Sequence, residues 1–384
     1  MKKLIALLLV LALAFTLCAC GKKAEETTQT PAAADSQTAV PGEGASPEDP
    51  PRDDRIFGTL SVLNMTEEEF LAVISARGLI VDRLIAGGPR GDEMPEGQPP
   101  EGQPPEGQPP KTTITFYDTL DALLMALNAG DINTIEIYES VARYLCATNE
   151  NLMIGPGFDA DKVSETFAEL IQNGINGNDF AFLLMESNAE LRDEFNAAIA
   201  DMKADGTMDR LVREQIDDLV NGGEIKPIEL PHFDGAETIR VAVTGALPPM
   251  DYVAADGTPA GFNTAVLAEI ANRTGKNIEI VVVDSLGRAA ALASGAVDAV
   301  FWTRTSSAAQ TVSVETETEH EAKMTEHKAN MTEEEIKVID DLIERIDFKA
   351  YAGSDMPEGT IVTEPYFSDV IVPVMLAGGG PQGK

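Results

Sequence analysis

Short apolar runs alternate with helical segments from residue 55 to residue 302, and this alternation limits the fold more than any other feature. Strands are predicted at 56–62, 113–117, 134–137, 179–185, 238–244, 278–283 and 299–302. Helices are predicted from Thr66 onward and at 119–128, 140–149, 189–220, 263–274 and 287–293. Alternating strands and helices build sheets with helices on both faces. The sequence therefore predicts an α/β fold with doubly wound parallel sheets.

Two local signals concern where helices begin and break. Thr66 can cap a helix, and Glu69 stands three residues later, which is the spacing of a capping box. The long helix over 189–220 is expected to break near Asp205 and Gly206.

One stretch of the chain corresponds to another. Residues 118–140 and 284–302 both read as a short Ala-rich helix, a Gly turn and a strand, with Gly130 and Gly295 at the helix ends. Two similar units suggest two lobes of similar build. The alternative is that short units of this kind recur by chance.

The first residues predict export. Lys2 and Lys3 precede an apolar run over 4–17, which is shorter than the ~20 residues of a membrane span and typical of a signal peptide. The ending Leu17-Cys18-Ala19-Cys20 resembles the bacterial lipobox, which implies cleavage before Cys20 and lipidation of its thiol. The alternative is an ordinary signal peptide with a chance cysteine.

Composition divides the chain into segments. Residues 96–110 repeat Glu-Gly-Gln-Pro-Pro, which blocks helix and ladder formation. The predicted order is a signal peptide with lipobox (1–20), a disordered tether (21–54), a lobe-two-like α/β domain (55–226) with a Pro-rich insertion (95–111), a linker (227–235), a lobe-one-like α/β domain (236–310), a polar insertion (311–335), and a C-terminal helix with a return strand (336–384).

The net charge and the cysteine content argue against nucleic-acid-binding proteins and against disulfide-stabilised folds. The net charge of −36 argues against nucleic-acid binding, which requires basic residues, and is typical of a solvated acidic surface. Once Cys18 is cleaved off and Cys20 is lipidated, only Cys146 remains, so no internal disulfide is expected. Stability must therefore come from apolar burial.

No motif of an enzyme is present. The histidines, His232, His320 and His327, match no zinc spacing, and neither a Gly-x-Ser-x-Gly elbow nor a Walker loop occurs. Cys146 is interpreted as a buried apolar residue. We therefore expect no catalytic residues, no metal and no cofactor.

Several motifs lie at informative spacings. The strand Ile239–Val243 is followed by Pro248-Pro249, Asp256-Gly257, Gly261-Phe262 and Gly295-x-x-Asp298-Ala299. This stretch resembles the first lobe of the extracellular solute-binding proteins of bacterial ABC importers, amino-acid-binding class (family 3). Residues 112–220 resemble the second lobe, which closes on 190–198 and 203–209. The resemblance implies two Rossmann-like lobes of the periplasmic-binding-protein type II kind, joined by a hinge.

This chain departs from the family pattern. In the family lobe one comes first, whereas here the lobe-two-like segment precedes it, through either circular permutation or truncation of a tandem pair. The family has a Thr-x-x-Arg element whose arginine binds the ligand carboxylate. In this chain Arg304 lies close to the position of that arginine but is out of register. The family's acidic residue for the ligand amine aligns with Tyr138, and Glu139 is one position off. The stretch 363–367 resembles a return strand that rebuilds a hinge.

Three groups of residues at strand ends are candidates for ligand contact, because open α/β sheets bind ligands there. Arginine can clamp a carboxylate and aromatic rings can stack on a ligand. The alternative is that Tyr138 and Tyr252 are core rings and that Arg304 pairs with a surface acid. The predicted ligand-binding residues are Met250, Asp251 and Tyr252, then Trp302, Thr303 and Arg304, and then Tyr138, Glu139 and Ser140.

These observations predict a lipid-anchored solute-binding protein on the outer face of the cytoplasmic membrane. It would capture a small molecule, such as an amino acid or related zwitterion, and deliver it to an ABC permease. The alternative is a sensor or scaffold lipoprotein built on the same fold that no longer transports.

Overall fold

The computed structural model describes residues 55–80, 84, 112–155, 162–171, 177–254, 256–305, 325, 327–345 and 357–378. The predicted signal peptide, lipidated Cys20, tether and Pro-rich insertion lie outside these residues. Of the predicted polar insertion, only 325 and 327–335 are described. None of the helices in the described ranges is both long enough and apolar enough to span a membrane.

The first sheet has the strand order β2-β1-β3-β13-β4. β1 runs parallel to β2 and β3, whereas β13 runs antiparallel to β3 and β4. Its strands are β1 (Arg55–Leu60), β2 (Thr112–Tyr117), β3 (Thr134–Tyr138), β4 (Leu152–Ile154) and β13 (Phe367–Leu376).

The second sheet repeats this plan in the order β10-β6-β11-β5-β12. β6 runs parallel to β10 and β11, whereas β5 runs antiparallel to β11 and β12. Its strands are β5 (Gly177–Met185), β6 (Thr238–Val243), β10 (Asn277–Val282), β11 (Ala299–Thr305) and β12 (Thr360–Val362). A small separate sheet contains β7 (Ala246–Leu247), β8 (Asp251–Val253) and β9 (Pro259–Ala260).

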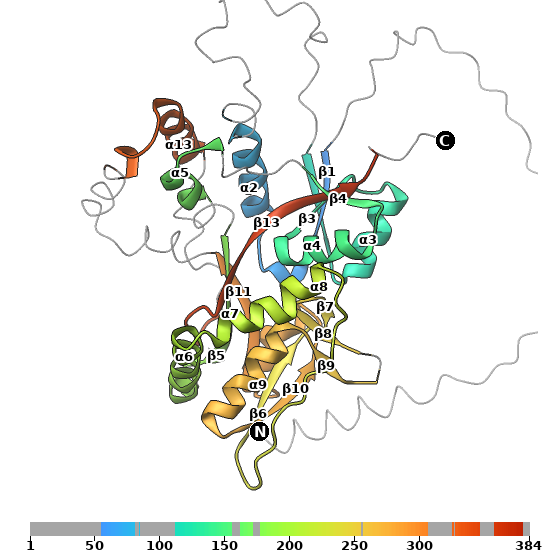
Figure 1. The fold of residues 1–384 in the computed structure, drawn as a ribbon, viewed down its shortest axis with the longest axis vertical. Coiled ribbons are helices and arrows are strands. Elements are labelled where there is room, and N and C mark those ends of the chain that lie inside the picture. The colour runs from blue at the N-terminus through green and yellow to red at the C-terminus, as the bar shows by residue number, and fades with distance from the viewer. Residues whose placement is uncertain are drawn as a thin grey trace, which may run out of the picture. The chain divides into compact units, whose positions relative to one another are not determined.

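One strand joins the two sheets. β13 pairs with β5 through Phe367–Val370 and then with β3 through Ile371–Val374, so it leaves one sheet and enters the other (Figure 1). We call residues 55–171 and 371–376 the first half of the molecule. Residues 177–305 and 360–370 are the second half. Of the stretch 363–367, in which the sequence indicated a return strand, only Phe367 belongs to β13.

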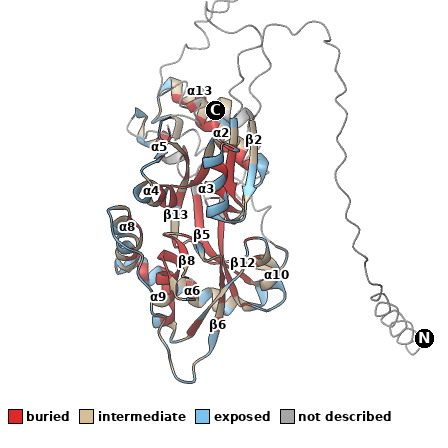
Figure 2. Ribbon diagram, turned by 90° about the vertical axis from the view of Figure 1, so that its right-hand side faces the viewer, coloured by how far each residue is buried: buried red, intermediate tan, exposed pale blue. Residues whose placement is uncertain are grey.

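Helices flank both sheets and carry the exposed residues, whereas the strands are mostly buried (Figure 2). In the first half these are the 3-10 turn η1 (Ser61–Leu63), α2 (Glu67–Ile80), α3 (Leu120–Ala129), α4 (Glu139–Thr148) and α5 (Glu165–Leu170). In the second half they are η5 (Glu186–Asn188), α6 (Ala189–Ala204), α7 (Thr207–Val212), the π-turn η6 (Arg213–Asp217), α8 (Asp218–Val220), α9 (Phe262–Thr274) and α10 (Gly287–Ala293). A last helix, α13 (Glu333–Arg345), packs against α2.

The local signals of the sequence are confirmed. The Thr66 backbone N–H donates to Glu69 Oε2 (2.6 Å), and the Glu69 N–H donates to Thr66 Oγ1 (3.2 Å), which is a capping box. The long helix breaks at Gly206, whose φ of 78° lies in the left-handed region that glycine favours. Gly130 and Gly295 both follow short helices with positive φ, as the internal correspondence predicted.

The predicted α/β class is confirmed, with one correction. The sheets are mixed rather than parallel, because β5 and β13 run against their neighbours. β5 is mostly buried and β13 is partly buried, both have few charged residues, and the sequence pattern alone does not distinguish their direction.

Candidate functional site

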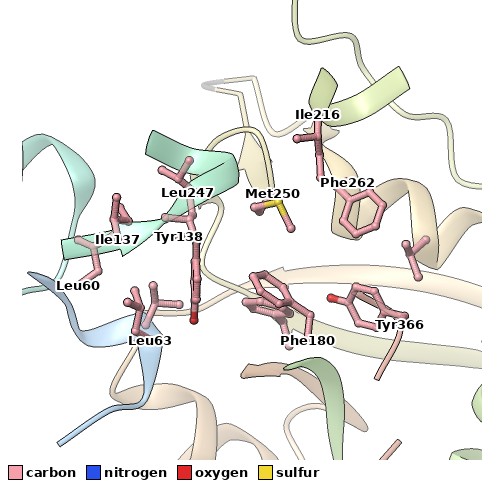
Figure 3. Close-up of a cluster of buried hydrophobic side chains, with 14 of the residues drawn as sticks. Leu60, Leu63, Ile137, Tyr138, Phe180, Ile216, Leu247, Met250, Phe262 and Tyr366 are labelled. Atoms are coloured by element: carbon pink, nitrogen blue, oxygen red, sulfur yellow. The ribbon is translucent and has the colours of Figure 1, made fainter. Parts of the chain in front are cut away.

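The two halves meet along a seam. Thr303 Oγ1 on β11 donates to the Leu63 carbonyl of η1 (3.0 Å), and the Tyr138 ring at the end of β3 lies 4.8 Å from the ring of Phe180 on β5. Figure 3 shows Tyr138 facing Phe180, with Leu60 and Leu63 on one side and Tyr366 on the other. The seam thus includes the end of β3, where ligand residues were predicted, and residues inside β5 and β11.

Met250, Asp251 and Tyr252 lie where β8 begins. Met250 and Asp251 are buried, whereas Tyr252 is half-buried. Asp251 Oδ2 accepts from the backbone N–H and the hydroxyl of Thr244 (2.8 and 2.9 Å), while Oδ1 has no partner in the described part of the chain. Burial raises the pKa of Asp251, although Gly245, Thr244 and Arg288 act against it.

Tyr138, Glu139 and Ser140 have different surroundings. Tyr138 is fully buried, and burial raises the pKa of its hydroxyl, with Thr303 and Arg288 opposing that effect. No hydrogen bond of standard distance and angle reaches its oxygen from the described residues, although the Thr303 side chain lies close enough to lower its pKa. Glu139 is exposed, and the backbone N–H of buried Ser140 donates to Asp369 Oδ2 on β13 (3.1 Å).

Trp302 and Thr303 point to opposite faces of the second sheet. Trp302 belongs to a small core beneath α10 with Leu292 and Val297, whereas Thr303 lies at the seam. Arg304 lies within β11, and its side chain is outside the part of the chain that the structure describes.

The structure adds Arg288, which was not predicted. This residue of α10 is fully buried, and its guanidinium carbon lies 5.1 Å from the centre of the Trp302 ring. Burial lowers the pKa of Arg288 to about 10, with Tyr138 and Asp251 acting in the opposite direction. The sequence held one signal for it, since Arg288 is the single charged residue of a helix that otherwise reads Gly-Ala-Ala-Ala-Leu-Ala.

Tyr366 and Asn263 complete the polar part of the seam. The Tyr366 hydroxyl donates to Asn263 Oδ1 at the start of α9 (2.7 Å), and Asn263 Nδ2 has no partner among the described residues. Burial, Asp251 and Tyr138 all raise the pKa of Tyr366. These groups therefore influence one another across the seam.

The site combines a buried cation, a buried acid and polar atoms that have no partner. Tyr138, Asp251 and Arg288 are brought together, and Ser285 Oγ and Trp302 Nε1 are also buried without a partner in the described residues. Such atoms are rare in folded proteins and indicate a place for water or a ligand. Within the described residues, no group of three His, Cys, Asp or Glu is arranged to hold a metal ion.

Part of the chain matches a known family. Residues 239–336 of the 384 match the model of bacterial extracellular solute-binding proteins, family 3. The match runs from β6 into α13 and includes Asp251, Arg288 and Trp302. None of the curated proteins compared matches the sequence.

The chain is also similar to solved structures of transport proteins. One is the ligand-binding component of an ABC-type import system from Staphylococcus aureus (8% identity, TM-score 0.33), with 84% of this chain and 65% of that chain covered. A second is a phosphate-binding protein of a phosphate ABC transporter from Streptococcus pneumoniae (9%, TM-score 0.30; 84% and 88%). A third is a putative L-cystine ABC transporter from Listeria monocytogenes (10%, TM-score 0.28; 85% and 83%).

The chain spans about 65% of the length of the Staphylococcus protein. The α/β class rests on the strand order, which repeats in both sheets, and on the helices that flank them. The family matched by residues 239–336 is one of solute-binding proteins rather than enzymes. That this chain has no catalytic activity stays a prediction.

Proposed function

We propose that this protein is a lipid-anchored extracytoplasmic solute-binding protein that captures an amino acid or related zwitterion for an ABC importer. The observation that carries the proposal is the buried polar set at the seam, with Arg288 and Asp251 in the second half and Tyr138 in the first. The family match over 239–336 supports the class, and the N-terminal lipobox resemblance supports the anchor.

The chemistry of the seam favours a ligand with both charges. Asp251 Oδ1, which has no hydrogen-bond partner of standard geometry among the described residues, suits an ammonium group, whereas the Tyr138 hydroxyl and the Arg288 guanidinium suit a carboxylate. Met250, Ser140 and Thr303 would contact the ligand from nearby. Tyr252, Glu139, Trp302 and Arg304 remain part of the proposed site, although the first two are more exposed and Trp302 packs beneath α10.

Sheet pairing supports a circular permutation of the two lobes. One chain supplies every strand of both sheets, and α8 leads through the 227–235 linker into β6. β5 pairs with β11, and Arg273 near the end of α9 bonds Asp205 at the end of α6 (2.8 Å), so 177–220 would complete the lobe that begins at β6. A truncated tandem would be expected to leave one sheet with missing strands.

A second function is favoured by the packing of the seam. Met250, Tyr138 and Phe180 are fully buried in one apolar cluster that spans both halves. A seam closed by side chains suits a sensor or scaffold lipoprotein that no longer transports. Binding of a small ligand requires that the seam open, which hinge bending through β5 and β13 would permit.

A thermal-shift screen of the full chain against amino acids, polyamines and small peptides tests the proposal. A ligand at 100 times its Kd should stabilise the fold by about 2.7 kcal/mol. The shift should disappear in Asp251→Asn and weaken in Tyr138→Phe. The matched control Tyr117→Phe, on the edge strand β2, should keep it. A flat screen on a chain that unfolds cooperatively would favour the sensor or scaffold function.

A further inference from the structure

Arg288 connects the two halves of the molecule. Within the second half, its Nε donates to the Ser285 carbonyl (3.1 Å) and its Nη1 donates to the Phe301 carbonyl (2.8 Å). Its Nη2 reaches the first half, where it donates to the Val62 carbonyl (3.2 Å) and to Asn64 Oδ1 (2.7 Å). One side chain therefore holds η1 of the first half against β11 of the second.

Asn64 of the first half also donates a hydrogen bond to the second half. Its Nδ2 donates to the Thr303 carbonyl (3.2 Å), while the Thr303 hydroxyl donates to the Leu63 carbonyl (3.0 Å). Asn64 has a φ of 55°, and no other non-glycine residue in the described ranges has a positive φ. Backbone strain of this kind persists where the surroundings fix the residue, and here it places both ends of the amide in the seam.

The bonds of Arg288 go to neutral acceptors. No carboxylate in the described part of the chain lies within ion-pair distance of its guanidinium, which is fully buried. If η1 moved away, Nη2 would lose both acceptors while Nε and Nη1 kept theirs. The two freed N–H groups, both on Nη2, are then available to donate to oxygens of an acidic ligand. In the closed form, acceptors of the protein itself bind the Arg288 guanidinium.

We propose that Arg288, Asn64 and Thr303 form a seam latch, which keeps the two halves together when no ligand is bound. The latch differs from the pair of Arg143 and Asp217, which also crosses the seam but lies at the surface, with side chains 37% and 41% exposed. An exposed pair of that kind contributes little, whereas buried bonds to a charged group contribute more. Release of the latch frees the guanidinium, so the latch and an acidic ligand compete for it.

The distance between the halves tests the latch without any ligand, so the result does not depend on the proposed function. Spin labels are placed on two exposed positions, Met125→Cys in α3 and Ala293→Cys in α10, in a chain whose own three cysteines are serine. Pulsed electron resonance then gives the distance distribution. Asn64→Gly removes the side-chain bonds and fits the positive φ, and Arg288→Met removes the guanidinium.

The seam latch predicts one main distance in the unaltered chain. In Asn64→Gly, the population at longer distances should rise by roughly tenfold or more, since bonds to a charged group are lost. The matched control Arg240→Met loses bonds to Asp298 and Gly295 within the second half and should leave the distribution unchanged. Unchanged distances in Asn64→Gly would overturn the proposal even if Arg288→Met does not fold. Equal opening in Arg240→Met would also overturn it.

Discussion

At the scale of single residues, Asp369 is a strand residue of the second half that bonds a helix of the first half. The carboxylate lies on β13 and accepts from the backbone N–H of Ser140, at the start of α4, and from that of Val370 (3.1 and 2.8 Å). Burial raises the pKa of Asp369 from 3.8 to about 6, with Ser140 and Val370 opposing the shift and Glu139 adding to it. No sequence motif marks this residue, because its partner is 229 positions away.

The pH dependence of stability follows from that shift. Between pH 3.8 and about 6, the folded chain holds a proton on Asp369 that the unfolded chain has lost. This group therefore makes the folded state less stable as pH rises through that window, by about 3 kcal/mol in total. Asp369→Asn removes the dependence. Urea unfolding of both chains across this pH range should show their difference in free energy changing, and a constant difference would contradict the assignment.

At the scale of elements, a buried ion pair fixes α2 on the first sheet. Arg77 donates through Nη1 and Nη2 to the two carboxylate oxygens of Glu136 on β3, both at 2.8 Å, and the side chains are 8% and 1% exposed. The capping box at the start of α2 was predicted because it is local. This pair was not predicted, because it joins positions 59 apart and depends on how the helix packs.

Removing one partner of this pair should be costly. Arg77→Met leaves the Glu136 carboxylate buried without its cation and should lower the free energy of unfolding by about 3–5 kcal/mol. Arg77→Met combined with Glu136→Leu should recover much of the loss. The exposed pair of Arg192 and Asp193 provides the control, since Arg192→Met should cost under about 1 kcal/mol. Denaturant titrations measure all three, and equal losses for Arg77→Met and Arg192→Met would refute the assignment.

At the scale of the whole molecule, one apolar core serves both halves. The Phe180 ring lies 4.8 Å from that of Tyr138 in the first half and 5.5 Å from that of Phe301 in the second. The strands β1, β2, β3, β5, β6, β10 and β11 could be predicted from apolar runs, as could the repeated helix–glycine–strand unit, whereas the short strands β4, β7, β8, β9 and β12 could not. The crossing of β13 between the sheets could not, because strand pairing depends on contacts between distant segments.

A shared core predicts a shared unfolding transition. Phe180→Ala should lower the stability by about 3–5 kcal/mol, because it empties a fully buried site. The fluorescence of Trp302, the single tryptophan, reports on unfolding of the second half, while circular dichroism reports on unfolding of both halves. The two signals should shift together. Separate transitions would show that the halves fold independently. Phe116→Ala, at a ring 37% exposed, should shift both signals only slightly.

The most direct test of a ligand site at the seam is a crystal structure of the chain with the compound that gives the largest thermal shift. The account predicts that the ligand lies between the halves, with its ammonium group on Asp251 Oδ1 and its carboxylate on the Tyr138 hydroxyl and Arg288. It also predicts that Arg288 has then left Val62 and Asn64. A ligand bound elsewhere, or one at the seam that leaves Asp251 without a partner, would contradict the account.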